Sequence, residues 1–224
     1  MVDSNSSSVL KNVTEEEKYS IFTKGTLLNI KHSRIFEGML NVIQDYKDDI
    51  IYVKLTEPFI KGNILIGDKV KCQILSNEYE YTVFAEVYHI DISSPGIVKI
   101  QTNRVYKYQN IRRDKRYLVN FRANILKDII SDPVYAIVKN ISLSGMAVVC
   151  NHKFQTLIDV KIKFSTSLHT SEYIETTANI IRESSHEGYN EYGLMFLDMG
   201  EKNKEALKNL INNLENKKIT LLDS

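Results

Sequence analysis

Apolar residues alternate with polar ones along much of the chain, which is the period of a β-strand with one buried face. The clearest case is the segment 160–164, where Val160, Ile162 and Phe164 are separated by lysines. Runs rich in Val, Ile, Tyr and Phe are divided by turns of Asp, Asn, Gly and Pro. The pattern predicts strands at 25–30, 36–43, 50–55, 69–75, 81–90 and 97–101, and again at 117–126, 134–139, 145–150, 158–164, 173–182 and 192–197.

Two segments follow the helical period instead. Thr14 and Glu17 have the spacing of a capping box, which predicts a short helix after a polar N-terminal tail. Between residues 201 and 216, apolar side chains recur every three or four positions and predict an amphipathic helix. The chain is therefore expected to be mainly all-β, with two barrel-like domains, the second having six strands and a C-terminal helix.

The segment 104–116 breaks the strand pattern because it contains few apolar residues and ends in a dense basic cluster. We interpret it as the connection between the two domains. The predicted organisation is a tail with a short helix at 1–20, an N-terminal β-domain at 21–108 and a second domain at 109–224, whose first residues, 109–116, form the linker.

Composition narrows the class of protein. The 224 residues carry a net charge of +1, which argues against broad binding of polymeric nucleic acid. No apolar run approaches the ~20 residues that span a bilayer, and the N-terminus lacks the features of a signal peptide. Cys72 and Cys150 lie in separate apolar segments, so we expect buried free thiols. A cytoplasmic protein without membrane insertion is expected.

Three of the seven arginines of this lysine-rich chain fall within five residues, as Arg112, Arg113 and Arg116. A guanidinium presents a planar fork of donors that grips a phosphate or the O6/N7 edge of guanine. In an extended linker, Arg112 and Arg116 would point the same way, about 13 Å apart. Taken alone, the spacing is weak, and a solvated basic linker that confers solubility explains it better.

A second polar group lies between two predicted strands and consists of Asn140, Ser142 and Gly145. The Asn140 amide can match the edge of a base, and the Ser142 hydroxyl can bond a phosphate or the backbone. Gly145 permits a positive φ angle or a close approach of the backbone to a ligand. Taken alone, these residues also fit an ordinary hairpin turn.

In this order the two groups resemble the signature of the PilZ family, RxxxR followed by [D/N]xSxxG. Arg112 and Arg116 match the first part, and Asn140, Ser142 and Gly145 match the second. The segment 192–196 also resembles a late strand of PilZ domains. The resemblance covers about residues 109–216 and implies a six-stranded PilZ barrel. The N-terminal half resembles, less specifically, the accessory domain of YcgR-type flagellar brake proteins.

The resemblance implies that the chain binds cyclic di-GMP, a bacterial second messenger with two guanines and two phosphates. By that analogy Arg112 and Arg116 contact guanine edges and phosphates, Asn140 a guanine, and Ser142 a phosphate or its surroundings, while Arg113 fits a frequent doubled arginine. The ligand would order the linker and change the interdomain arrangement. The implied output is regulation of motility through flagellar motor components, or another process controlled by cyclic di-GMP.

Other functions have less support in the sequence. No nucleophile elbow, zinc-protease helix or phosphate-binding loop is present, so we expect no enzyme, no metal and no cofactor. A ligand-independent PilZ-like scaffold for protein partners is an alternative. Binding of single-stranded nucleic acid by tyrosines is a weaker one.

Overall fold

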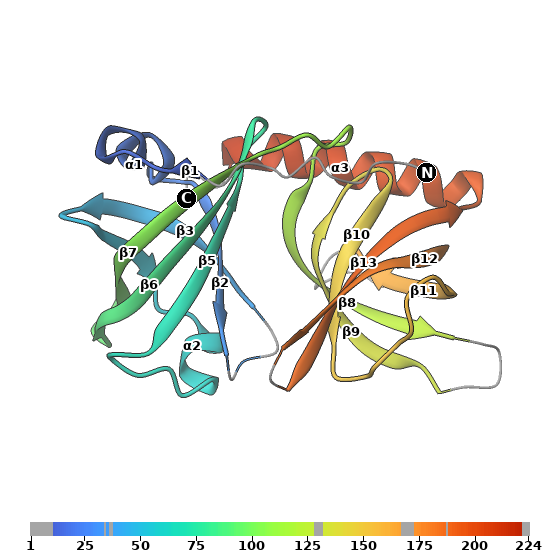
Figure 1. Cartoon of the computed structure of the whole chain (residues 1–224), viewed down its shortest axis with the longest axis horizontal. Coiled ribbons are helices and arrows are strands. Elements are labelled where there is room, and N and C mark those ends of the chain that lie inside the picture. The colour runs from blue at the N-terminus through green and yellow to red at the C-terminus, as the bar shows by residue number, and fades with distance from the viewer. Residues whose placement is uncertain are drawn as a thin grey trace. The chain divides into compact units, whose positions relative to one another are not determined.

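The computed structural model describes residues 11–33, 35, 38–127, 132–166, 173–186 and 188–220. It divides into two compact units, the first formed by Met1–Ile30 and Asn41–Arg113 and the second by Lys31–Leu40 and Asp114–Ser224 (Figure 1). The first ten residues of the tail segment predicted at 1–20, and Phe36 at the start of one predicted strand, lie outside the described residues.

The first sheet is built from strands that close on themselves. Its strand order is β1-β7-β4-β3-β2-β5-β6, and β7 also pairs with β6, so that six strands form a barrel and β1 extends β7 on its other side. The elements are β1 (Lys11–Asn12), α1 (Glu15–Ile21), β2 (Leu27–His32), β3 (Met39–Lys47), β4 (Ile50–Lys54), α2 (Glu57–Lys61), β5 (Lys69–Leu75), β6 (Tyr79–Asp91) and β7 (Ile97–Gln109).

The capping box at the start of α1 is confirmed. The Glu17 amide donates to Thr14 Oγ1 at 3.3 Å, and the Thr14 amide donates to Glu17 Oε2 at 3.0 Å. These two bonds satisfy amides that an uncapped helix would leave exposed.

The turn between β3 and β4 anchors α1 to the barrel. Asp48 and Asp49 have positive φ angles of 52° and 60°, as a tight hairpin requires. The Asp49 carboxylate accepts hydrogen bonds from Lys18 Nζ at 2.9 Å and from the Tyr46 hydroxyl at 2.8 Å. A single acidic residue thus ties the helix to the hairpin.

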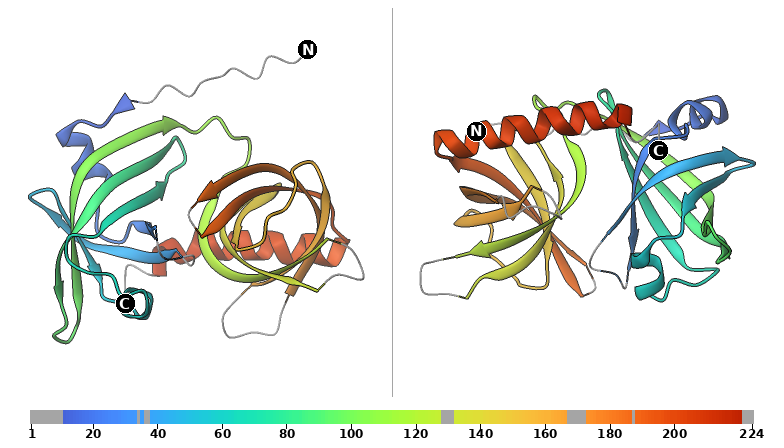
Figure 2. Two further views of the ribbon diagram at one scale, coloured as in Figure 1. Left: turned by 60° about the horizontal axis from the view of Figure 1, so that its bottom comes forward. Right: turned by 180° about the vertical axis from the view of Figure 1, so that it is seen from behind.

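The second barrel has the strand order β10-β13-β12-β11-β8-β9 and is closed. Figure 2 shows the ring of strands from two further directions. The elements are β8 (Tyr117–Leu126), β9 (Val134–Ile141), β10 (Gly145–Cys150), β11 (Asp159–Ser165), β12 (Tyr173–His186), β13 (Tyr189–Asp198) and α3 (Glu201–Thr220). The predicted six strands followed by a helix are confirmed.

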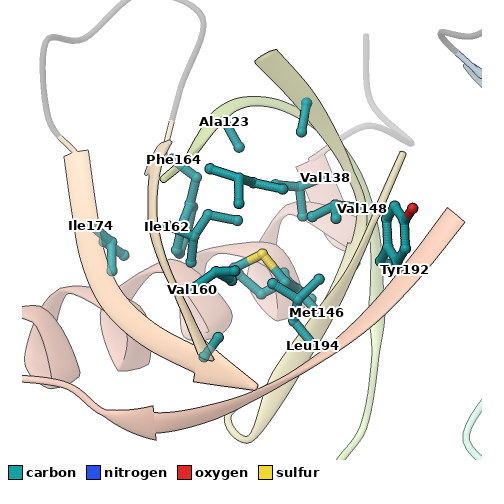
Figure 3. Packing of buried hydrophobic residues seen from close by; sticks show 14 of the residues in the cluster. Ala123, Val138, Met146, Val148, Val160, Ile162, Phe164, Ile174, Tyr192 and Leu194 are labelled. Atoms are coloured by element: carbon teal, nitrogen blue, oxygen red, sulfur yellow. The ribbon is translucent and has the colours of Figure 1, made fainter. Parts of the chain in front are cut away.

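Alternate residues of every strand fill this barrel. Figure 3 shows such side chains pointing into the interior, among them Ala123, Val138, Val148, Ile162 and Tyr192. The buried face of α3, formed by Leu207, Leu210 and Ile211, belongs to the same core. Because each large apolar side chain contributes about 1.5–3 kcal/mol when buried, the helix is an integral part of this unit.

The predicted connection at 104–116 was wrong over its first six residues. Arg104 to Gln109 continue β7 and pair with β6, for example Val105 with Val83 and Tyr106 with Thr82. Only Val105 of this stretch is buried, so the apolar alternation that would have marked a strand is absent. The short elements β1 and α2 were not predicted at all.

Candidate functional site

The arginine segment runs from Asn110 to Arg116, between β7 and β8. It bends at Arg113 and Asp114 and is not the fully extended linker that the sequence predicted. Arg112 and Arg113 are exposed and belong to the first unit, whereas Arg116 is half-buried and belongs to the second.

Within the first unit, Arg112 contacts an acidic residue. Arg112 Nη1 donates to Glu80 Oε2 at 2.9 Å. The Arg112 amide also donates to Asn110 Oδ1 at 3.3 Å. The first arginine of the segment therefore has a carboxylate partner that sequence reasoning missed.

Asn140 lies in the centre of three strands of the second barrel. Its Cα partners are Leu118 on β8 and Ala147 on β10, and the residue is 5% exposed. Among the described residues, nothing donates a hydrogen bond to the buried oxygen Asn140 Oδ1. A buried acceptor without a partner costs about 1–3 kcal/mol, so this position suits a donor supplied from outside the chain.

Ser142 and Gly145 build the turn between β9 and β10. The Ser142 amide and hydroxyl both donate to Gly145 O, at 2.8 and 3.1 Å. The hydroxyl proton of Ser142 is therefore used within the turn, while the hydroxyl oxygen can still accept a hydrogen bond.

The reason for a glycine at 145 differs from the one that the sequence suggested. Gly145 is not among the residues with positive φ. A Cβ atom there would lie 2.2 Å from Leu194 O on β13, which is far inside van der Waals contact. The close approach is thus to the neighbouring strand.

The second half of the arginine segment is attached to α3. Lys115 Nζ lies 3.2 Å from Glu215 Oε1, and the Tyr117 hydroxyl donates to the same carboxylate. Burial, together with the hydrogen bond to Glu215, raises the pKa of Tyr117. Glu215, like Glu80, was not identified from the sequence.

The second unit brings four predicted residues to one end of its barrel. Tyr117 is the Cα partner of Ile141, so Arg116, one residue earlier, stands beside the turn that begins at Ser142. Asn140 and Gly145 flank the same turn. This end of the barrel combines a guanidinium, a buried amide acceptor and a hydroxyl oxygen, which together match a polar, anionic ligand.

In the described ranges, no three His, Cys, Asp or Glu side chains are grouped to hold a metal ion. No helix in the same ranges has both the length and the apolar character to cross a membrane. Cys72 and Cys150 are buried free thiols, as predicted.

Residues 110–213 match the family described as PilZ domain. No sequence among curated proteins matches the chain.

Several solved structures are similar. The inhibitor of motility MotI/DgrA of Bacillus subtilis is 14% identical, with a TM-score of 0.42 over 87% of this chain and 99% of that one. YcgR of Escherichia coli in complex with c-di-GMP is 12% identical, with a TM-score of 0.44 over 93% of each chain. The MrkH–c-di-GMP complex of K. pneumoniae is 11% identical, with a TM-score of 0.47 over 93% and 97%.

Proposed function

We propose that the protein is a non-enzymatic receptor for cyclic di-GMP, because its residues 110–213 match the PilZ domain family. Its ligand residues are Arg112, Arg113, Arg116, Asn140, Ser142 and Gly145, the last acting by shaping the turn. Its first domain is the YcgR-like β-domain at 21–108, and the PilZ domain with its linker occupies 109–224.

The observation that carries this proposal is the unpartnered oxygen of Asn140. Guanine has donors on one edge and the acceptors O6 and N7 on another. An amide oxygen that accepts no hydrogen bond from any described residue complements the donor edge. Arginine forks complement the acceptor edge and the phosphates. The same ligand would thus satisfy both groups.

The position of the arginines supports a switching role. Arg112, Arg113, Lys115 and Arg116 place four positive charges within five residues of the connecting segment. Two phosphates would neutralise part of this charge and offset the ordering of the segment, which costs about 1–2 kcal/mol per residue fixed. Ligand affinity is then coupled to the path of the linker, and so to the interdomain arrangement.

The output of such a switch is a surface for a protein partner. We propose that the liganded chain regulates motility by contacting a flagellar motor component, or acts on another process that cyclic di-GMP controls.

Isothermal titration calorimetry tests the proposal. Cyclic di-GMP should bind with a Kd between nanomolar and low micromolar, about −8 to −12 kcal/mol, and GTP far more weakly. Asn140→Ala should weaken binding about tenfold or more, because an amide partner of the base is lost. Asn124→Ala, at an exposed position of β8, is the matched control and should bind like the wild type. If a folded sample shows no binding of cyclic di-GMP at tens of micromolar ligand, the receptor function is refuted.

A further inference from the structure

The β5–β6 hairpin of the first unit holds Arg112. Glu80 lies in β6, where its Cα partner is Tyr108 of β7. Arg112 follows three residues after the end of β7 at Gln109, and its Nη1 lies 2.9 Å from Glu80 Oε2. Although residue Arg112 as a whole is exposed, its side chain is 33% exposed and that of Glu80 21%, so water reaches the ion pair in part.

Further hydrogen bonds hold both partners of the Arg112–Glu80 contact in position. On the arginine side, the Asn110 amide donates to Glu78 O at 2.7 Å and its side-chain Nδ2 donates to Asn77 O at 3.2 Å. These bonds fasten the first residue of the segment to the hairpin turn. On the acidic side, Gln73 Nε2 donates to Glu80 Oε1 at 2.5 Å, which leaves Oε2 directed at the guanidinium.

We propose that Glu80 is an internal competitor for Arg112, which sets the concentration of ligand at which the receptor responds. The inference rests on the proposed function, since it takes Arg112 as a ligand residue. A guanidinium engaged with Glu80 is not free to grip a phosphate or a guanine. The apparent affinity is therefore reduced by the fraction of chains in which Arg112 is released.

The size of the effect follows from the exposure of the pair. Ion pairs that water partly reaches favour their closed form about two- to fivefold. At these ratios Arg112 is released in about one chain in three to one in six, so removing the charge of Glu80 should tighten ligand binding about three- to sixfold. A gain of affinity on losing a contact is diagnostic, because a residue that contacts the ligand or merely supports the fold would weaken binding when changed.

Calorimetry with cyclic di-GMP on four variants of the full chain tests the competition. Glu80→Gln should bind about three- to sixfold more tightly than the wild type. Glu78→Gln is the matched control, since it removes an exposed carboxylate from the same hairpin, and should leave the affinity unchanged. In an Arg112→Ala background, Glu80→Gln should have no further effect, because the competing arginine is gone.

A second readout needs no ligand. Amide hydrogen exchange across 110–113 should be faster in Glu80→Gln than in the wild type, and unchanged in Glu78→Gln. Unchanged or weaker ligand binding by Glu80→Gln, with a wild type that binds, would overturn the competition and leave the proposed function intact. Failure of every variant to bind would overturn the proposed function and the competition together, while the exchange result would still report whether Glu80 holds the segment.

Discussion

Gly145 is constrained by its neighbour on β13. A Cβ atom at this position would lie 2.2 Å from Leu194 O, a backbone atom that cannot rotate away. Gly145→Ala should therefore push β10 and β13 apart and destabilise the second barrel by about 3 kcal/mol. Urea unfolding followed by circular dichroism measures this loss.

Gly193, in the same strand pair, provides the control. A Cβ atom there would come no closer than 3.4 Å, to the Arg182 side chain, which is ordinary contact. Gly193→Ala should change the free energy of unfolding by less than about 1 kcal/mol. Equal losses in the two variants would show that the predicted clash with Leu194 is not what makes position 145 sensitive.

Substitutions of Arg116 test whether ligand binding requires the planar guanidinium group of arginine. Arg116→Ala should cost at least about 2 kcal/mol of cyclic di-GMP affinity, because a charged hydrogen-bonding partner is removed. Arg116→Lys should also bind poorly, since an ammonium group cannot reproduce the planar fork. Calorimetry decides the point. Full affinity in Arg116→Lys would rule out a bidentate contact.

At the scale of elements, the attachment of α1 to the β3–β4 turn depends on the charge of Asp49. The hydrogen bond from Lys18, with a further one from Tyr46, lowers the pKa of Asp49 below its ordinary value of 3.8. A carboxylate with a lowered folded-state pKa stabilises the protein above the unfolded-state pKa, and this stability is lost as the pH falls through the folded-state pKa.

Because the Asp49 side chain is 41% exposed and water screens its ion pair with Lys18, Asp49→Asn should reduce the free energy of unfolding by only about 1 kcal/mol at pH 7. The difference from the wild type should shrink as the pH falls below about 4, where the carboxylate of the unfolded chain binds a proton, and should be gone below the lowered pKa of the native carboxylate. Urea unfolding at both pH values checks this. Asp48→Asn, in the exposed position of the same turn, should stay within about 0.5 kcal/mol of the wild type at either pH. If the difference in the free energy of unfolding between Asp49→Asn and the wild type persists at low pH, the destabilisation comes from the changed packing of the side chain and not from its lost charge.

The success of prediction at this scale follows the burial pattern. Strands such as β11, in which Val160, Ile162 and Phe164 are buried and the lysines between them are not, are visible as alternation. The last six residues of β7 pair with β6 through their backbone, but only Val105 among them is buried. The sequence of this stretch therefore lacks the alternation of apolar and polar residues that marks a strand. Helix α2 has only five residues, of which Phe59 alone is buried, so a window of helical length contains no stripe.

The candidate site divides in the same way. The arginines, Asn140 and Ser142 could be proposed because together they resemble the PilZ signature, whereas each group alone also fits a basic linker or a hairpin turn. Glu80 and Glu215 could not, because they meet Arg112 and Tyr117 across 32 and 98 residues. Such contacts are created by barrel closure and helix docking, which no local pattern encodes.

At the scale of the whole molecule, ligand binding should be visible as a change in both the linker and the domain arrangement. Cyclic di-GMP should slow hydrogen exchange across 110–117 and around 140–145, because the arginine segment and the β9–β10 turn become ordered together. Small-angle scattering should show an altered profile. Protection limited to 140–145, with an unchanged profile, would mean that the ligand binds without switching the protein.

The clash that excludes any side chain from position 145 also bears on how the signature would decay through evolution. A descendant that no longer bound the nucleotide could replace its arginines and Asn140, because these substitutions would not prevent the barrel from folding. It would not be free to replace the glycine, because β13 still passes 2.2 Å from where a Cβ atom would sit. In a genome survey, the glycine would then indicate only that the barrel is present, and the arginines would indicate that the barrel still binds a ligand.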